Sequence, residues 1–425
     1  MQVTALHLKN FRNYADLTLA LSSGINIFLG ANAQGKTNIL EAICYASLGR
    51  SHRTHQDSDL IRFSEPAGIL QLAFSRRDVP SRIDIQLPRK GRRKLLLNGQ
   101  SIRPKDLVGT LNTVLFSPED LFLIKGAPAG RRHFLDSEIS QARPAYYHEL
   151  LTFGRLLQQR NTLLKRIRER HSAPNLLAPW DPQLAASAAR ITKKRQEAVK
   201  KLHMLANLMQ RKISNSKENL SLTYEIHGLE NNESQSLLSD ERHDRNGTVF
   251  ESQRGFIRNP LSRSVDSVEA PLAPATKETS IPAQTPPSNQ VTSPLESWYN
   301  KRLEARRDLD ILRGVTSVGP HRDDLSMTVN GIDLRAYGSQ GQQRTGALAL
   351  KLAELEFLRS ETGEYPILLL DDVMSELDAS RREALLAFLQ REHIQTIITA
   401  TDAAYFPRDD FGTVYHVENG NVTRA

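Results

Sequence analysis

A short glycine-bearing loop carries the clearest chemical signal in this chain. Residues 30–37 read Gly-Ala-Asn-Ala-Gln-Gly-Lys-Thr and match the pattern G-x-x-x-x-G-K-[ST] between a predicted strand and a predicted helix. The glycines let successive N–H groups point inward, and the helix N-terminus adds partial positive charge. We expect Lys36 to neutralise the charge of the β- and γ-phosphates and the Thr37 hydroxyl to bind Mg²⁺. The predicted phosphate-binding residues are Gly30, Ala31, Asn32, Ala33, Gln34, Gly35, Lys36 and Thr37.

Two adjacent carboxylates supply the expected second half of such a site. The apolar run 366–370 is typical of a buried strand and ends in Asp371 and Asp372. We expect Asp371 to hold the metal together with Thr37, and Asp372 to polarise the attacking water. Because many strands end in acidic turns, the pair becomes informative only in a chain that also has the phosphate loop.

Two further segments complete a recognisable set. Residues 339–344 (Ser-Gln-Gly-Gln-Gln-Arg) begin a predicted helix whose N–H groups and hydroxyl suit an anion, and residues 375–378 (Ser-Glu-Leu-Asp) follow the carboxylates. Together they resemble the signature and D-loop of ABC-type ATPases, in which the signature of one subunit covers the γ-phosphate bound by the other. This resemblance implies contacts with ATP across a head-to-tail dimer. The residues concerned are Ser339, Gln340, Gly341 and Asp378.

Apolar patterns around these motifs predict strands that alternate with helices. Predicted strands lie near 3–8, 17–21, 25–29, 69–74, 83–87, 325–329, 366–370 and 396–398. Predicted helices lie at 36–48, 303–312, 339–359 and 381–390, and Asn98-Gly99 predicts a hairpin turn. Strands that alternate with helices imply an α/β domain with a parallel sheet.

Two internal regions differ from this pattern. Residues 148–215 have apolar residues at steps of three and four in two runs separated by a proline-bearing turn, which predicts an antiparallel helical hairpin. The pattern leaves open whether this hairpin projects as an arm or packs on the core. Residues 229–295 are rich in Ser, Pro and Thr, which predicts a disordered insert. The expected parts are therefore head (1–147), helical arm (148–228), insert (229–295) and head again (296–425).

Composition narrows the classes of function. The chain has 425 residues and a net charge of +8, which favours a polyanionic partner such as nucleic acid, although a mildly basic protein without one remains open. No apolar run approaches the roughly 20 residues of a membrane span, and the N-terminal residues do not read as a secretory signal. Cys44 is the only cysteine, so no internal disulfide can form and a cytoplasmic location is expected.

Local motifs along the chain, outside 229–295, resemble those of the bacterial RecF family. They are residues 8–14, 49–53, 117–121, 131–132, 319–324, 339–344 and 371–378. The long gap between Lys36 and Ser339 also resembles the SMC and Rad50 class, although the helical segment here is only one hairpin long. The fold implied by this resemblance is an α/β ABC-type ATPase head, with a mixed sheet, flanking helices and P-loop, and an inserted helical-hairpin arm domain.

The RecF resemblance also implies a function. It implies a DNA replication and repair protein that binds ATP and Mg²⁺, forms an ATP-dependent homodimer on DNA gaps or single-strand/double-strand junctions, and works with RecR and RecO to load recombinase. Its ATPase is expected to be weak, DNA-dependent and switch-like. Asp372, one methylene shorter than the usual Glu, is consistent with slow hydrolysis. Arg12 and Asn13 would lie near the nucleotide, with a simple surface turn as the open alternative. The γ-phosphate sensor and the glutamine loop stay unassigned.

Two basic clusters are the candidates for DNA contacts. Arg50, His52 and Arg53 form the first, and Arg92 and Arg93 belong to the second, at 89–94. Such clusters position a protein on phosphates without reading sequence. Because no aromatic run accompanies them, we expect contacts with the duplex backbone, and solvated basic surfaces are the alternative. A transport energiser and a non-hydrolysing adaptor are the competing functions, the first disfavoured by the spacing and the helical segment.

Overall fold

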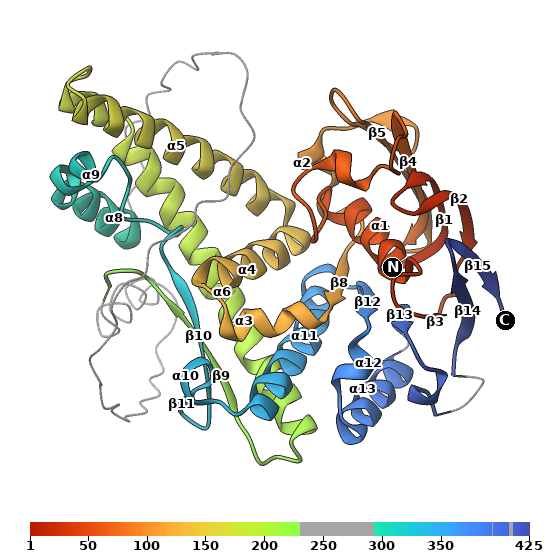
Figure 1. Cartoon of the computed structure of the whole chain (residues 1–425). Helices are drawn as coiled ribbons and strands as arrows, with labels where there is room; N and C mark the ends of the chain where they lie inside the picture. The colour runs from red at the N-terminus through yellow and green to blue at the C-terminus, as the bar shows by residue number, and fades with distance from the viewer. Residues whose placement is uncertain (230–292, 393, 408–410) are drawn as a thin grey trace.

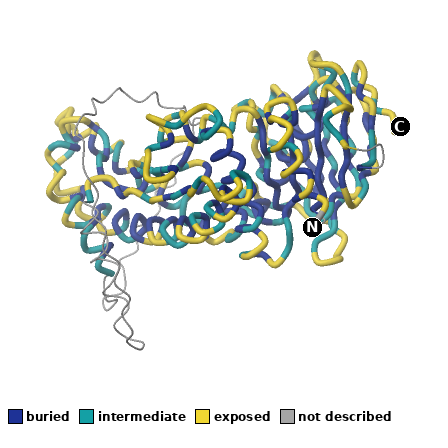
Figure 2. The backbone as a smooth tube through the Cα atoms, turned by 90° about the horizontal axis from the view of Figure 1, so that it is seen from below, coloured by how far each residue is buried: buried dark blue, intermediate teal, exposed yellow. Residues whose placement is uncertain are grey.

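The computed structural model describes residues 1–229, 293–392, 394–407 and 411–425. The predicted insert at 229–295 therefore lies, apart from its ends, outside the described residues. The molecule is elongated, with sheets at one end and a helical lobe at the other (Figure 1). Buried residues run through both ends (Figure 2). No helix in the described ranges is long and apolar enough to cross a membrane.

The central sheet is mixed and has the strand order β15-β14-β3-β13-β12-β8. Its strands are β3 (Ile25–Leu29), β8 (Thr113–Phe116), β12 (Ile367–Asp371), β13 (Thr396–Ala400), β14 (Thr413–Glu418) and β15 (Asn421–Arg424). All neighbours pair in parallel except β14 and β15. β3 and β13 are buried throughout, as continuous apolar runs in parallel sheets usually are. The segments after β3 and β12 therefore leave the sheet at one edge, on either side of β13.

A second sheet is antiparallel, with the order β2-β1-β4-β5-β6-β7. Its strands are β1 (Gln2–Phe11), β2 (Tyr14–Ala20), β4 (Ala67–Arg76), β5 (Val79–Pro88), β6 (Lys94–Leu97) and β7 (Gln100–Ser101). Helix α1 (Lys36–Leu48) shares a core with both sheets and is buried almost all round. The predicted turn Asn98-Gly99 joins β6 to β7, and both residues have the positive φ that a tight hairpin requires.

The helical lobe is built on the predicted hairpin, α5 (Pro144–Arg168) and α6 (Asp181–Ile213). α6 packs against α5 on one side and against α11 (Gln340–Thr362) on another. It also contacts a small antiparallel sheet of β9 (Leu220–Glu225), β10 (Asp324–Val329) and β11 (Ile332–Asp333). The remaining helices are α2 (Pro104–Leu107), α3 (Leu121–Lys125), α4 (Pro128–Ala142), α8 (Pro294–Ala305), α9 (Arg307–Arg313), α10 (Leu334–Tyr337), α12 (Val373–Glu376) and α13 (Ala379–Glu392).

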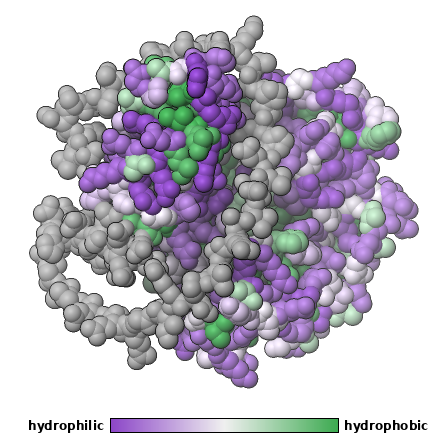
Figure 3. Space-filling view, turned by 60° about the vertical axis from the view of Figure 1, so that its left-hand side comes forward, coloured by the Kyte–Doolittle hydropathy of each residue, from purple (hydrophilic) through white to green (hydrophobic). Residues whose placement is uncertain are grey.

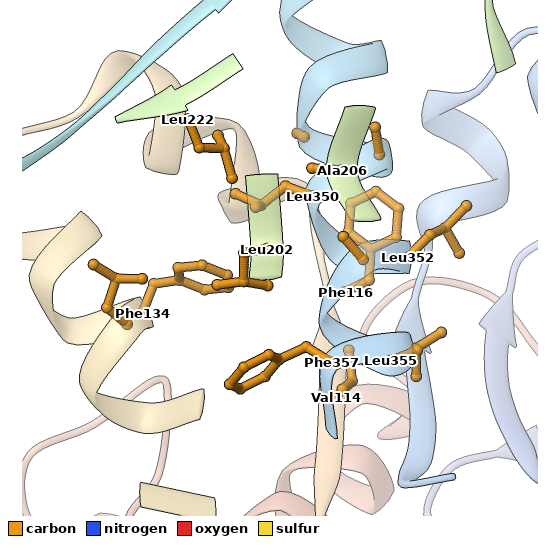
Figure 4. Packing of buried hydrophobic residues seen from close by; sticks show 14 of the residues in the cluster. Val114, Phe116, Phe134, Leu202, Ala206, Leu222, Leu350, Leu352, Leu355 and Phe357 are labelled. Atoms are coloured by element: carbon orange, nitrogen blue, oxygen red, sulfur yellow. The ribbon is translucent and has the colours of Figure 1, made fainter. Parts of the chain in front are cut away.

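One hydrophobic core joins the lobe to the central sheet. Figure 4 shows Phe134 of α4, Leu202 of α6 and Leu222 of β9 gathered around Leu350 of α11, with Phe116 of β8 nearby. α11 therefore packs against both the helical lobe, at α6, and the central sheet, at β8. The outer face of the lobe is mostly hydrophilic, with small separate hydrophobic patches (Figure 3).

The predicted helix at 303–312 is wrong in its extent. The structure has α8 and α9 on either side of Arg306, where the helix is interrupted. The elements that were not predicted are the strands β8, β9, β11, β14 and β15 and the helices α2, α3, α4, α10 and α12. β9 becomes a strand by pairing with β10, about a hundred residues away in sequence, which no local pattern reveals.

Charged side chains inside the lobe satisfy each other. The Arg160 side chain is fully buried and donates to Asp181 Oδ1 and Asp310 Oδ2, both at 2.8 Å, and to Thr316 Oγ1 at 2.9 Å. It therefore ties α5 to the start of α6 and to α9. The Arg at this position, which interrupts the heptad-like apolar pattern of residues 148–215, is a buried structural cation.

Replacing this cation should be costly. We expect Arg160→Met to lower the free energy of unfolding by about 3–5 kcal/mol, because it leaves the fully buried carboxylate of Asp310 without its counterion. Asp181, by contrast, keeps its ion pair with Arg307. Urea denaturation measures this loss. The matched control is Arg190→Met, whose guanidinium is more than half exposed beside Glu149; it should cost under about 1 kcal/mol. Equal effects of the two substitutions would contradict the assignment.

Candidate nucleotide-binding site

The phosphate loop lies between β3 and α1, as predicted, and both of its glycines are required by space. A Cβ on Gly30 would lie 2.3 Å from the Val417 carbonyl oxygen. Gly35 has φ 111°, and a Cβ there would lie 2.4 Å from Asn13 Nδ2. Larger side chains would therefore push the loop away from β14 and from the β1–β2 turn.

The Lys36 ammonium lies across this loop. Its Nζ donates to the carbonyl oxygens of Gly30 at 2.5 Å and Ala31 at 2.8 Å, and the side chain is buried. Burial lowers the pKa of Lys36, and the nearby charges of Asp372 and Asp371 oppose this shift. A cation held by carbonyl oxygens alone is well placed to exchange them for phosphate oxygens.

Thr37 and Asp371 meet at the carboxyl edge of the central sheet. Thr37 Oγ1 donates to Asp371 Oδ1 at 2.8 Å, and Thr399 Oγ1 donates to the same oxygen at 2.8 Å. A hydroxyl and a carboxylate in contact fit Mg²⁺, which takes few protein ligands and several from water and phosphate. The described residues contain no group of three or more His, Cys, Asp or Glu that could hold a metal ion.

Asp372 occupies a constrained position next to this pair. Its φ of 52° is left-handed, and its N–H donates to Thr399 Oγ1 at 2.9 Å. Its Oδ1 is buried and has no hydrogen-bond partner. Burial raises the pKa of Asp372, Lys36 opposes the rise, and Asp371 adds to it. An unsatisfied carboxylate oxygen with elevated basicity is suited to accept a proton from water.

These groups surround one cavity of about 460 Å³. It is large enough for the triphosphate part of a nucleotide. Its wall combines the phosphate loop, the carboxylate pair, Thr399 and the start of the 118–120 turn. The lining residues are Asn32, Ala33, Gly35, Lys36, Thr37, Asn38, Arg53, Pro118, Glu119, Asp371, Asp372 and Thr399.

The β1–β2 turn braces the phosphate loop from outside. Asn13 Nδ2 donates to the Gln34 carbonyl at 3.0 Å, and Tyr14 OH donates to the Gly35 carbonyl at 3.0 Å. Arg12 adopts a left-handed φ of 53° and forms a two-bond ion pair with Glu41 of α1 at 2.8 and 2.6 Å. Asn13 thus touches the loop directly, whereas Arg12 is held by Glu41.

The signature segment lies elsewhere on the same chain. Ser339 is the exposed N-cap of α11, and its Oγ accepts from Gln342 N at 3.2 Å. Neither Ser339, Gln340 nor Gly341 lines the cavity. Arg381 joins this helix start to the D-loop, since it donates to the Gly341 carbonyl at 3.3 Å and pairs with Asp378. The candidate phosphate- and metal-binding residues therefore share one cavity, and the exposed start of α11 lies outside it.

Comparisons with known proteins agree with this geometry. The family model described as RecF/RecN/SMC N terminal domain matches residues 2–423. The DNA replication and repair protein RecF of Halothermothrix orenii is 40% identical over 429 residues, covering 100% of this chain and 99% of that protein. RecF of Heliobacterium modesticaldum is 38% identical, with both chains covered completely.

The chain belongs to the RecF family. Among solved structures, it is similar to the recombination mediator protein RecF-ATP of the RecFOR pathway, with a TM-score of 0.79, 32% identity and coverage of 100% of this chain and 97% of that one. An Smc head bound to the C-winged helix domain of ScpA matches with a TM-score of 0.52 at 15% identity and shows the fold alone. The fold is accordingly the RecF/SMC-type head of an ABC-type ATPase.

Within this RecF-family site, Glu41 was not predicted. Its carboxylate is fully buried and accepts from Arg12, from Ser51 Oγ at 2.5 Å and from Arg53 Nη1 at 3.2 Å. The hydrogen bonds of Thr399 with Asp371 and Asp372 were also not predicted, because the sequence analysis assigned no role to Thr399. Both could have been suspected only from their neighbours in space.

The basic residues predicted for DNA are not equivalent in the structure. Arg53 lines the nucleotide cavity and donates to Asn38 Oδ1 at 2.8 Å. Arg93 is engaged by the Gly49 carbonyl at 2.6 Å, the Tyr45 hydroxyl at 2.7 Å and Asp57, so it secures the end of α1. Arg50, His52 and Arg92 are exposed. A role of these residues in DNA binding stays a prediction.

The Glu41 ion-pair cluster gives a pH-dependent prediction. Burial opposes ionisation of Glu41, but hydrogen bonds from Arg12 and Ser51 and the charges of Arg12 and Arg53 bring its pKa below the ordinary 4.5. Its stabilising effect is therefore present above pH 4.5 and is lost as pH falls through the lower pKa of the folded state. Glu41→Gln should lower the free energy of unfolding by about 2 kcal/mol near neutral pH.

This difference should shrink on acidification below pH 4.5. Urea unfolding of both proteins across the pH range measures it. Glu149→Gln, which affects a partly exposed pair with Arg190, is the control and should have a small effect. A loss at Glu41 that does not change with pH would contradict the electrostatic explanation.

Proposed function

We propose that this RecF-family chain is an ATP-gated DNA-binding protein of replication and recombinational repair. ATP and Mg²⁺ bind at the phosphate loop, two chains close head to tail around two nucleotides, and slow hydrolysis releases the dimer. The observation that carries the proposal is where the candidate site residues lie. The groups proposed to bind phosphate and metal, among them Lys36, Thr37 and Asp371, line the cavity, whereas the residues proposed as the signature, Ser339 to Gly341, lie outside it.

Exposure of the signature supports closure by a second chain. A helix N-terminus attracts anions through its N–H groups and dipole. The start of α11 is exposed, and its backbone is fixed by the Ser339–Gln342 capping box and by Arg381. Because the capping box uses the N–H groups of Ser339 and Gln342, we infer that the N–H groups of Gln340 and Gly341 bind the anion, which in the ABC-type fold is the γ-phosphate of a nucleotide on another copy.

We infer DNA and partner proteins for this chain from the family to which it belongs. The curated relatives are named DNA replication and repair protein RecF, and the similar solved structures belong to the RecFOR pathway. We accordingly infer duplexes and single-strand/double-strand junctions as the DNA targets and RecR and RecO as partners. Exposed Arg50, His52 and Arg92 are the proposed phosphate contacts.

The trans-acting signature makes a sharp prediction. Ser339→Ala should leave ATP binding by the monomer within about twofold of wild type but weaken ATP-driven dimerisation at least tenfold, roughly the effect of losing one or two hydrogen bonds to a charged group per interface. Lys36→Ala should abolish both. Analytical ultracentrifugation with and without ATP measures the dimer, and fluorescent nucleotide titration measures binding.

Two controls accompany this experiment. Ser360→Ala changes an exposed serine at the other end of α11 and should dimerise normally. Ser339→Asn keeps a good N-cap residue but removes the hydroxyl, so it separates a signature defect from loss of the helix cap. Normal ATP-driven dimerisation by Ser339→Ala would refute closure through the signature.

Asp372 is the proposed base for hydrolysis. Asp372→Asn should retain ATP binding and dimerisation but reduce turnover about 100-fold, the usual contribution of a general base. Phosphate release with gapped duplex DNA measures turnover, and sedimentation with ATP measures the dimer.

The matched control is Asp402→Asn, an exposed carboxylate just after β13 that caps the turn 403–405. It should leave turnover unchanged. Unaltered hydrolysis by Asp372→Asn would remove this residue from the mechanism, and absence of wild-type turnover would instead favour a non-hydrolysing adaptor.

A further inference from the structure

A turn at residues 61–66 presents an unusual side chain to solvent. Phe63 is 92% exposed, the highest value among the large exposed hydrophobic residues described. A single exposed apolar residue is ordinary on a protein surface. Phe63 differs in two respects. Hydrogen bonds hold its turn in place although the ring is not part of a core, and basic residues lie next to the turn.

Backbone hydrogen bonds fix the turn from both sides. Arg62 N donates to the Asn10 carbonyl at 2.9 Å, and Glu65 N donates to the Arg62 carbonyl at 3.1 Å. Ser64 adopts a positive φ of 67°, which completes a tight turn with Phe63 at its corner. The Asn10 side chain also donates to Glu65 at 3.1 Å.

Arg89 closes the turn from the β5–β6 connection. Its Nε donates to the Glu65 carbonyl at 2.8 Å and its Nη2 to the Arg62 carbonyl at 2.9 Å. The basic segment 89–94 is therefore attached to the Phe63 turn. Arg62, Arg89, Lys90 and Arg92 are all exposed there. The sequence separates this aromatic residue from the basic segment, and the fold brings them together.

The same turn is connected to the nucleotide site. Arg12 N donates to the Leu60 carbonyl at 2.7 Å, and Arg12 Nη1 donates to the Asp59 carbonyl at 2.8 Å. Its neighbour Asn13 bonds to the phosphate loop at Gln34. A short rigid path, the β1–β2 turn, thus holds both the phosphate loop and the base of the Phe63 turn.

We propose that Phe63 is a specificity residue that stacks on an unpaired base where a DNA duplex meets a single strand. The neighbouring cations hold the backbone phosphates, and the ring stacks on the π-face of an unpaired base, which base stacking hides in the interior of a duplex. This inference rests on the proposed DNA-binding function and adds the group that distinguishes a junction from plain duplex.

The experiment compares three DNAs with full-length protein and ATP: a covalently closed circular duplex, which has no exposed terminal base pair, a single strand, and a duplex with a single-stranded extension carrying 2-aminopurine at the first unpaired position. Phe63→Ala should weaken junction binding about tenfold, the loss of one base–aromatic stack, and leave binding of the circular duplex within about twofold. Phe63→Leu should behave like Phe63→Ala because it keeps apolar area but no ring. Phe63→Trp should bind the junction at least as tightly as wild type.

Probe fluorescence reports the stack directly. Wild-type protein should quench 2-aminopurine at the junction, and Phe63→Ala should not. Val79→Ala is the matched control, because Val79 is 61% exposed at the opposite end of the β4–β5 hairpin. Equal loss on duplex and junction, or an unchanged Phe63→Ala curve with the wild-type quench retained, would overturn the inference. Wild-type protein that binds none of the three DNAs with ATP would instead refute the underlying function.

Discussion

The parallel pairing of β3, β13 and β12 is the constraint on which the site depends. It places the end of β3 and the end of β12 on either side of β13, so that Thr37 and Asp371, separated by 334 positions in sequence, bond at 2.8 Å. Thr399, at the end of the strand between them, contacts the carboxylate of Asp371 and the N–H of Asp372. A shift of one residue in the register of β12 or β13 would turn Asp371 or Thr399 to the opposite face of the sheet, so that they could no longer contact each other.

Buried ion pairs keep the remaining parts in position around this sheet. Arg131 of α4 binds both carboxylate oxygens of Asp324 at 2.8 Å, and Arg195 of α6 binds those of Asp136 at 2.9 Å. Arg195 also donates to the Pro320 carbonyl at 2.6 Å. Residues of the motifs at 131–132 and 319–324 thus join α4, α6 and β10 to one another. Such joints fix geometry more than they add stability, because desolvation offsets most of their Coulomb energy.

The cavity and the start of α11 lie in different parts of the chain. The phosphate loop, Asp371 and Asp372 line one cavity, and the start of α11 lies outside that cavity and is held by its own capping box. In the proposed dimer, little conformational entropy would have to be lost when two copies meet, because hydrogen bonds already hold both surfaces in place. The β1–β2 turn connects two parts of the molecule. It bonds to the phosphate loop on one side and to the base of the exposed Phe63 turn on the other.

The sequence alone determined the local chemistry. The phosphate loop, the Asp371–Asp372 pair and the Ser339 helix cap each depend on residues within a few positions of one another, so their strand, turn and helix context could be read directly. Three of the six strands of the central sheet, β3, β12 and β13, followed from apolar periodicity for the same reason, as did the helices α1, α5, α6, α11 and α13. Only the tertiary structure decided that Glu41 holds Arg12, that Thr399 joins the carboxylates, that Arg93 secures a helix end, and that Phe63 lies beside the 89–94 cations. These contacts join residues far apart in sequence, and their partners are chosen by strand register and buried charge pairing, which no local pattern encodes.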